Sequence, residues 1–291
     1  MVRLLRPSAV AAFLLSSPIV TSRAQSLQQV LFTSWGELCS VGMDTRRPSC
    51  LRSASEFDSP TWQPGGGRIV VEAGPHDDDH ILFLLDDRGR RIRRLAGSSR
   101  LGRPTWSPDG RYIYAIAYEL GMSLARWNAD GTGKVIVPVI FPSTTGTQLQ
   151  MISFSPSGAR AAILTQEFRE MLLAEVTTAG LRVFGTAPRG FRYVSQSVWP
   201  DENHVLFVGK QTGSQGELWR LTVADGRTER IGIDSLWLRD QIALCPDRGH
   251  VVVTATRGGP ETRWNLWTYP VAGGHARRLT TGTEDIVGSC R

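Results

Sequence analysis

Short apolar runs alternate with polar turns along most of the chain, and one arrangement of them recurs five times. In each copy an apolar piece ends in an aromatic residue or Leu, a tight turn follows, and a second apolar run comes next. The turns contain Pro, Asp, Asn or Gly, which fix or permit the backbone angles that a hairpin needs. The copies occupy 60–73, 104–117, 152–165, 197–209 and 242–255, which gives a period near 45 residues. This regularity predicts a fold built from repeated units.

Each copy continues into two further predicted strands. A variable polar loop leads to a third apolar run, as in ILFLLD at 81–86, and another turn precedes a short fourth strand, as in RIRRL at 91–95. Four short strands in about 45 residues are typical of one blade of a β-propeller. The sequence therefore predicts an all-β protein.

The two ends of the chain supply the parts of one more blade. Residues 28–52 provide strands two to four without a first strand, and 284–291 provide a first strand without successors. We therefore predict six four-stranded antiparallel blades, in a ring closed by the C-terminal strand joining the N-terminal blade. The expected blades are 27–52 with 284–291, then about 58–97, 102–138, 150–186, 195–232 and 240–281.

The N-terminus has the three-part pattern of a cleavable export signal. Arg3 and Arg6 precede an apolar stretch from Ala9 to Val20, and small residues lead to a predicted cut after Ala24. The alternative is a retained membrane anchor, but this stretch is well short of the roughly 20 residues that span a bilayer. We expect a signal peptide at 1–24, a propeller at 25–291, a periplasmic or secreted location, and no membrane span after cleavage.

Composition narrows the possible partners. The chain is 41% hydrophobic and 21% charged, which excludes a disordered protein. The formal charge of +6 includes three arginines of the predicted signal, and without them 30 basic residues face 27 acidic ones. A nearly neutral body gives no reason to expect a nucleic-acid partner. We expect a monomer.

The four cysteines allow disulfide bonds in an exported protein. Cys39 and Cys50 flank the turn at 44–45 symmetrically, so a cross-strand bond between them is feasible. Cys245 and Cys290 end the first strands of neighbouring blades, so a bond there is possible as well. Free thiols and other pairings remain open, and the spacing does not fit a zinc ribbon.

The repeat also resembles a known family. The phrase PTWSPDGRYIYAIA at 104–117, together with RRLT at 277–280, resembles the WD-like propeller repeats of the TolB family. The resemblance covers 28–291 and implies the propeller part only, without the N-terminal domain of TolB. Related repeats occur in propellers fused to serine peptidases and in some pectin-degrading lyases, so the resemblance specifies a fold rather than a function.

One polar loop contains residue types that bind metals. His76, Asp77, Asp79 and His80 fall in a predicted hairpin connection and are candidates for holding a divalent cation. The alternative is a hairpin tip that is simply solvated. No catalytic residue and no other cofactor are predicted, because the sequence has no GxSxG or HExxH motif.

Topology places the longest connections on one face of the ring. Aromatic and arginine side chains, which suit protein interfaces, gather there. The candidate partner-binding residues are Phe57, Arg100, Arg103, Phe141, Arg189, Phe191, Tyr193, Trp237 and Arg239. A possible polar ring at the channel mouth consists of Asp58, Gln150, Gln196, Asp240 and Gln241. Ordinary loop packing and bound water are the alternatives.

These observations favour a non-catalytic scaffold that binds a protein or peptide in the cell envelope through this face. The alternative function is a divalent-metal-dependent lyase or hydrolase that acts on a polysaccharide or small molecule at the channel mouth.

Overall fold

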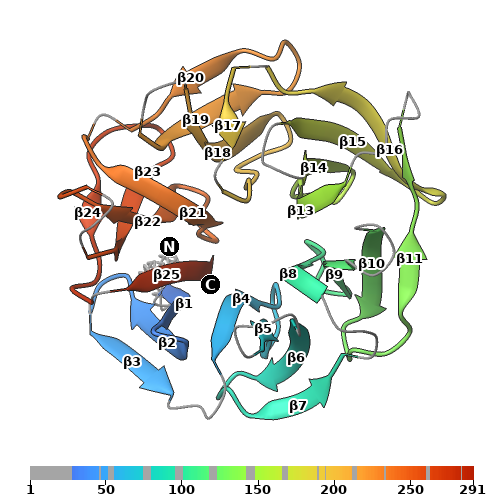
Figure 1. The fold of residues 1–291 in the computed structure, drawn as a ribbon, viewed down its shortest axis with the longest axis horizontal. Helices are drawn as coiled ribbons and strands as arrows, with labels where there is room; N and C mark the ends of the chain where they lie inside the picture. Colours follow the sequence, from blue (N-terminus) through green and yellow to red (C-terminus); the bar gives the residue numbers. More distant parts are fainter. Residues whose placement is uncertain are drawn as a thin grey trace, which may run out of the picture.

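Six separate β-sheets stand around a central channel, so the predicted six-bladed propeller is confirmed (Figure 1). The computed structural model describes residues 28–45, 47–51, 56–74, 80–95, 101–117, 123–141, 148–165, 170–188, 190–193, 195–211, 215–232, 234–259, 263–282 and 284–291. Within them, no helix is long and apolar enough to cross a membrane.

Blade 1 closes the ring with strands from both ends of the described chain. Its sheet runs β25 (Asp285–Cys290), β1 (Gln29–Ser34), β2 (Glu37–Gly42) and β3 (Pro48–Leu51). β25 pairs antiparallel with β1, and the backbone N–H of Gln29 donates to the carbonyl of Arg291 over 2.7 Å. The expected closure by the C-terminal strand is therefore confirmed.

Blades 2, 3 and 6 are regular four-stranded antiparallel sheets. Blade 2 contains β4 (Phe57–Trp62), β5 (Arg68–Ala73), β6 (Ile81–Asp86) and β7 (Arg91–Arg94). Blade 3 contains β8 (Leu101–Trp106), β9 (Tyr112–Ala117), β10 (Ser123–Asn128) and β11 (Val135–Val137). Blade 6 contains β21 (Trp237–Leu244), β22 (His250–Thr256), β23 (Asn265–Pro270) and β24 (Arg277–Arg278).

Blades 4 and 5 depart from this pattern. Blade 4 contains β13 (Leu149–Phe154), β14 (Arg160–Thr165), β15 (Met171–Thr177), β16 (Gly180–Thr186) and a fifth strand, β12 (Val139–Ile140). β12 pairs parallel with β16, so the connection from blade 3 adds a strand at the outer edge. Blade 5 contains β17 (Arg192–Tyr193), β18 (His204–Lys210), β19 (Glu217–Thr222) and β20 (Thr228–Arg230).

The core lies between neighbouring blades. The second strands are buried almost along their whole length, because each blade is covered on both faces by its neighbours. Between blades 2 and 3, for example, Val70 and Leu84 pack with Ile113, Ala115 and Trp127. This explains why the second strands contain nearly continuous apolar runs rather than alternating ones.

Two disulfides join these elements. Cys39 and Cys50 are direct partners on β2 and β3, with Cα atoms 4.0 Å apart. Cys245 and Cys290 link blade 6 to the closing strand β25, with Cα atoms 4.8 Å apart. Both candidate pairings are therefore confirmed. Disulfides of this kind are typical of proteins that fold outside the cytoplasm.

Candidate functional site

β-Bulges interrupt the first strands of several blades, and those of blades 2 and 3 lie near the opening of the channel. In β4 the register shifts between Asp58 and Thr61, and in β8 it shifts between Gly102 and Thr105. Inside these bulges Ser59 and Arg103 have positive φ angles of 48° and 55°. A bulge changes the direction of neighbouring groups, and here it turns polar groups of blades 2 and 3 toward one another.

A pocket of about 280 Å³ opens beside these bulges, between blades 1 and 2. It lies on the face that carries the connections from strand two to strand three and from strand four to the next blade, which we call the loop-rich face. We call this cavity the acidic pocket. The side chains that give it its character are those of Trp35, Glu56, Asp58, Glu72, His80 and Glu284.

Trp35 stands at the rim of the acidic pocket with 71% of its surface exposed. Trp35 and Gly36 form the two-residue turn between β1 and β2, and their φ angles are 52° and 75°. Such a turn needs positive φ at both positions, for which Asn-Gly is the favoured pair. A tryptophan there keeps a backbone conformation that disfavours bulky residues, while presenting a large aromatic surface to solvent.

Glu72 is the buried carboxylate of the pocket, with 7% of its surface exposed. One oxygen accepts a hydrogen bond from the backbone N–H of Arg103 over 3.0 Å, and the other pairs with Nδ1 of His80. The bulge in β8 therefore supplies a donor that helps to hold a negative charge at the base of the pocket.

Asp58 lies beside Glu72 and accepts a 2.6 Å hydrogen bond from the N–H of Ser59. Its side chain is open to solvent through the pocket, but the surrounding protein removes much of its hydration. This desolvation, and then the negative charge of Glu72, raise the pKa of Asp58 above its ordinary value. A cation bound in the pocket would offset both effects.

Glu284 forms the side of the pocket that belongs to blade 1. Its carboxylate accepts a 2.7 Å hydrogen bond from Nη1 of Arg239, and that guanidinium lies 5.3 Å from the ring centroid of Trp264. Arg239 is thus held in an ion pair on the loop-rich face, as part of a polar link between blades 6 and 1.

The structure gives the predicted partner-binding residues different surroundings. The side chains of Phe57 and Tyr193 are buried in the core, and the hydroxyl of Tyr193 donates to the carbonyl of Pro188 over 3.1 Å. Half-buried positions are occupied by Arg103, Phe141, Phe191, Trp237 and Arg239. Arg100 and Arg189 lie outside the described residues. Partner contact by these residues stays a prediction.

The predicted polar ring is distributed over two places. Asp58 lies in the acidic pocket, whereas Gln196 lines the central channel and donates to the carbonyl of Ile152 over 2.8 Å. Gln241 is buried and donates to Oγ of Ser59 over 3.1 Å. Gln150 is half-buried, and the side chain of Asp240 lies outside the described residues. Gln196 and Gln241 therefore form hydrogen bonds between different blades near the channel.

The candidate cation loop is described only at its last residue. His76, Asp77 and Asp79 lie outside the described residues, while His80 pairs with Glu72. Among the residues that the structure describes, no group of three or more His, Cys, Asp or Glu side chains is arranged to hold a metal ion. The cation therefore stays a prediction.

Sequence reasoning did not identify Trp35, Glu56, Glu72 or Glu284. The turn at 35–36 carried a usable signal, because an aromatic residue occupies the place of Asn in a two-residue hairpin. Glu72 is the cross-strand partner of Asp58 on β5, but a bulge shifts that register from the one the turn alone would indicate. Glu56 and Glu284 carried no signal, since they precede the first strands of blades 2 and 1 and share a pocket only in the closed ring.

Comparison with known proteins supports the fold. No protein-family model and no curated protein matches the sequence. TolB from Acinetobacter baumannii is similar in structure, with a TM-score of 0.69 at 16% identity, over 91% of this chain and 67% of that chain. A structure described as TolB from Agrobacterium tumefaciens gives 0.65 at 15% identity, over 90% and 92% of the two chains.

A protein of unknown function from Desulfotomaculum acetoxidans gives a TM-score of 0.58 at 10% identity, over 90% of this chain and 99% of that chain. At such low identities the likeness concerns the fold. The predicted resemblance to TolB propellers is confirmed at that level.

Proposed function

We propose that this protein is an exported, non-catalytic propeller that binds a protein or peptide through its loop-rich face, with the acidic pocket as the central contact. The observation that carries the proposal is the 71% exposed Trp35 at the rim of a cavity containing several carboxylates. Exposed tryptophans beside a cavity are typical of residues that dominate binding energy in protein interfaces.

The charges of the pocket indicate what kind of segment binds. Glu56, Asp58, Glu72 and Glu284 face His80 and the amide of Arg103, with the guanidinium of Arg239 at the side. A lysine, an arginine or an N-terminal amine would meet carboxylates on one side and the ring of Trp35 on the other. Both contacts favour a cation. The bound segment is therefore basic.

The export component rests on the N-terminal pattern and on two disulfides. Residues 1–27 lie outside the described residues, so cleavage after Ala24 and a periplasmic or secreted location are part of the proposal. The likeness to TolB structures supports the propeller fold alone, and the partner is inferred from the pocket.

Binding of short peptides tests the proposal directly. We expect a lysine-containing peptide to bind the purified, oxidised protein, and a peptide with glutamate in place of each lysine not to bind, by isothermal titration calorimetry. Trp35→Ala and Asp58→Asn should each weaken binding about tenfold or more, the range for truncating a central interface residue. The matched control is Phe184→Ala, since Phe184 is 46% exposed on the outer strand β16.

Equal affinity for the two peptides, or unchanged binding by both pocket variants, would contradict the proposal. The alternative of a metal-dependent enzyme at the channel mouth depends on His76, Asp77, Asp79 and His80, and it stays a prediction. Addition of a chelator distinguishes the two functions. Peptide binding through carboxylates and an aromatic ring should be unaffected by it, because these contacts need no metal.

A further inference from the structure

A cavity of about 720 Å³ lies at the outer part of blade 6, where the loop-rich face meets the last strand of the blade. We call it the arginine cavity. Its lining residues come from the end of β22, from the chain that enters β23, and from β24. All of them belong to blade 6, whereas the acidic pocket lies between blades 1 and 2. The two cavities are therefore separate sites.

Four exposed arginines line the arginine cavity: Arg257, Arg263, Arg277 and Arg278. No Asp or Glu is among the described residues that line it, and residues 260–262 lie outside the described part of the chain. A concave surface lined by charges of one sign concentrates its field within the cavity. The lining therefore favours an anionic ligand.

Trp267 positions two of the guanidinium groups on one face of the blade. The guanidinium of Arg257 lies 5.0 Å from the ring centroid of Trp267, and the indole N–H donates to the carbonyl of Ala255 over 3.1 Å. Arg278 is the cross-strand partner of Trp267, so both side chains lie on the same face of the sheet. Nε of Arg278 donates to the carbonyl of Thr280 over 2.7 Å, which leaves the N–H groups of both Nη atoms for a ligand.

Arg277 is oriented differently. It precedes Arg278 on β24, so its side chain lies on the opposite face of the sheet, toward blade 1. There its Nη2 donates to the carbonyl of Met43 over 3.0 Å. Arg263 stands just before β23 at the border of the cavity. The arginines placed to contact a ligand are therefore Arg257 and Arg278, with Arg263 at the rim.

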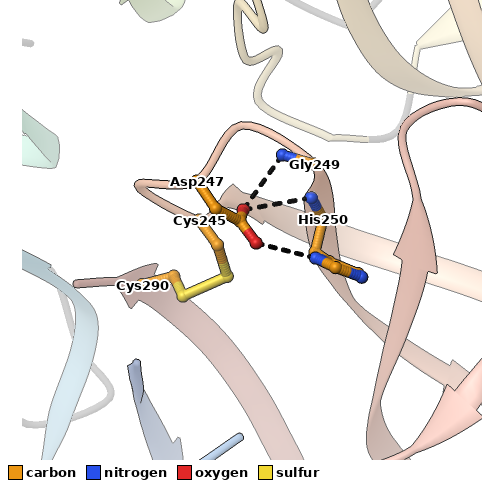
Figure 2. The surroundings of a disulfide bond; sticks show 5 residues. All are labelled: Cys245, Asp247, Gly249, His250 and Cys290. Carbon is orange, nitrogen blue, oxygen red and sulfur yellow. Dashed lines mark hydrogen bonds and ion pairs between the residues drawn. A yellow bond between two sulfur atoms is a disulfide. The ribbon is translucent and has the colours of Figure 1, made fainter. Parts of the chain in front are cut away.

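Other cationic side chains of this blade have carboxylate partners. Arg239 pairs with Glu284, and the ring of His250 pairs with Asp247 beside the disulfide that joins blade 6 to blade 1 (Figure 2). None of the three arginines placed to contact a ligand forms an ion pair with a carboxylate of the described residues. Their charges are therefore not neutralised by direct contacts within the described chain.

One carboxylate, that of Asp234, acts on the site from a distance. It interacts electrostatically with Arg257, but it pairs with the ring of His275 over 3.2 Å and accepts a hydrogen bond from the N–H of Ala276. A single carboxylate leaves an excess of positive charge around the cavity. A ligand with more than one negative charge fits this excess better than a ligand with one.

We infer that the arginine cavity binds a phosphate monoester group, which Arg257 and Arg278 hold with Arg263 at the rim. A guanidinium presents its N–H groups as a planar fork that matches two oxygens of a phosphate. A phosphate monoester carries about two negative charges at neutral pH, whereas a carboxylate carries one. The cavity is larger than a phosphate ion, so the group belongs to a larger molecule, either a soluble phosphorylated compound or a lipid whose headgroup is a phosphate monoester.

Two binding measurements distinguish these sources. Calorimetric titration with glycerol 3-phosphate tests the soluble compound, at about 0.15 M salt, where attraction to distant surface charges is largely screened. Glycerate, which has a carboxylate instead of the phosphate group, should bind at least about tenfold more weakly. Sedimentation with phosphatidylcholine vesicles that contain phosphatidic acid tests the lipid, and pure phosphatidylcholine vesicles are the control. We expect binding in at least one of the two measurements, and binding to vesicles alone would assign a lipid headgroup.

Matched variants locate the binding. Arg257→Gln and Arg278→Gln remove a guanidinium group, so each should weaken binding about tenfold. Arg277→Gln removes the same charge from the neighbouring position, but its guanidinium faces blade 1, so the affinity should hardly change. Circular dichroism checks that each variant is folded. Asp58→Asn should leave phosphate binding unchanged, which separates this inference from the function proposed for the acidic pocket.

Three results would overturn the inference. The first is that neither glycerol 3-phosphate at concentrations up to about 10 mM nor the vesicles with phosphatidic acid bind, since weaker binding is not specific. The second is that glycerate binds as tightly as glycerol 3-phosphate. The third is that neither Arg257→Gln nor Arg278→Gln weakens binding, or that Arg277→Gln weakens it equally, because a diffuse positive surface would then account for the attraction.

Discussion

Trp35 is the residue at which local preference and the proposed function conflict. Its turn requires positive φ at two successive positions, and a bulky aromatic residue pays for this in conformational energy. Trp35→Asn should relieve that strain and stabilise the protein by about 1 kcal/mol. Urea denaturation monitored by circular dichroism measures the change.

The same Trp35→Asn variant should bind the basic peptide much more weakly, because the aromatic surface is lost. Higher stability with weaker binding is the combination expected of a residue kept for recognition. A variant that is less stable than the parent protein would show instead that Trp35 is retained for packing.

The raised pKa of Asp58 determines in which direction the stability of the protein changes with pH. Its pKa in the folded protein is raised above the ordinary value of 3.8, by desolvation first and by Glu72 second. Protonation of Asp58 therefore favours the folded state. The stabilising contribution is complete below pH 3.8 and is lost as the pH rises through the raised folded value.

Asp58→Asn should consequently be more stable than the parent protein at pH 7, and the difference should shrink as the pH falls toward 4. Urea denaturation at a series of pH values, with Asp58 followed by NMR, tests this. A constant difference across that range would mean that Asp58 does not titrate as its surroundings indicate.

For single residues, the sequence predicted which residues pair better than it predicted which side chains are exposed. The symmetrical placement of Cys39 and Cys50 about their turn identified the disulfide as feasible, because hairpin register follows from the turn, and the structure confirms this pairing. Phe57 and Tyr193 were expected at an interface and lie in the core. Which side of a blade an aromatic ring occupies depends on the neighbouring blade, and the residue's own strand does not reveal it.

Among the elements, the fifth strand of blade 4 was not predicted from the repeat. β12 has only two residues, and its partner β16 is some forty positions further along the chain. The carbonyl of Pro138 accepts a hydrogen bond from the N–H of Leu181 over 2.9 Å. A contact formed by so short a segment leaves no periodic pattern in the sequence.

Gly180 makes this strand addition possible. Its φ angle is 130°, and a Cβ atom there would lie 2.3 Å from the carbonyl oxygen of Pro138. Gly180→Ala should therefore separate β12 from β16 and destabilise the protein by about 2 kcal/mol. Thermal unfolding measures the loss.

Gly185→Ala is the matched control, because Gly185 lies on the same strand and a Cβ atom there would meet nothing within 4 Å. Equal effects of the two substitutions would show that the close approach to Pro138 does not limit stability.

For the whole molecule, the closing strand is the feature on which cooperativity depends. β25 pairs with β1 and is also linked to blade 6 by Cys245–Cys290, a bond that spans 45 positions, whereas Cys39–Cys50 spans 11 within one blade. The chain-entropy model gives about 4 kcal/mol for the longer loop and about 3 kcal/mol for the shorter one.

Replacing Cys245 and Cys290 with Ser should therefore lower the free energy of unfolding more than replacing Cys39 and Cys50 with Ser. We expect the first variant also to unfold over a broader temperature range in calorimetry, because an opened ring loses coupling between its first and last blades. The opposite order of the two losses would indicate that β25 is held by strand pairing and packing alone.

The overall architecture could be predicted from the sequence because every copy of the repeat indicates the same four-stranded blade. The period near 45 residues and the incomplete pieces at the two ends were enough for six blades and for their closure. The acidic pocket was not predictable in this way. It combines residues of β4 and β5 in blade 2 with residues of β1 and β25 in blade 1, and these two blades face each other only in the folded ring.

Closure by β25 also sets an order of events during biosynthesis. β25 is made after every other described strand, so the edge of β1 that it covers stays open until β25 itself has been made. The bond between Cys39 and Cys50 can form as soon as one hairpin emerges, whereas Cys245 must wait for Cys290. The second disulfide thus marks the point at which the ring has closed, and until then the open edge is exposed to other unfinished chains.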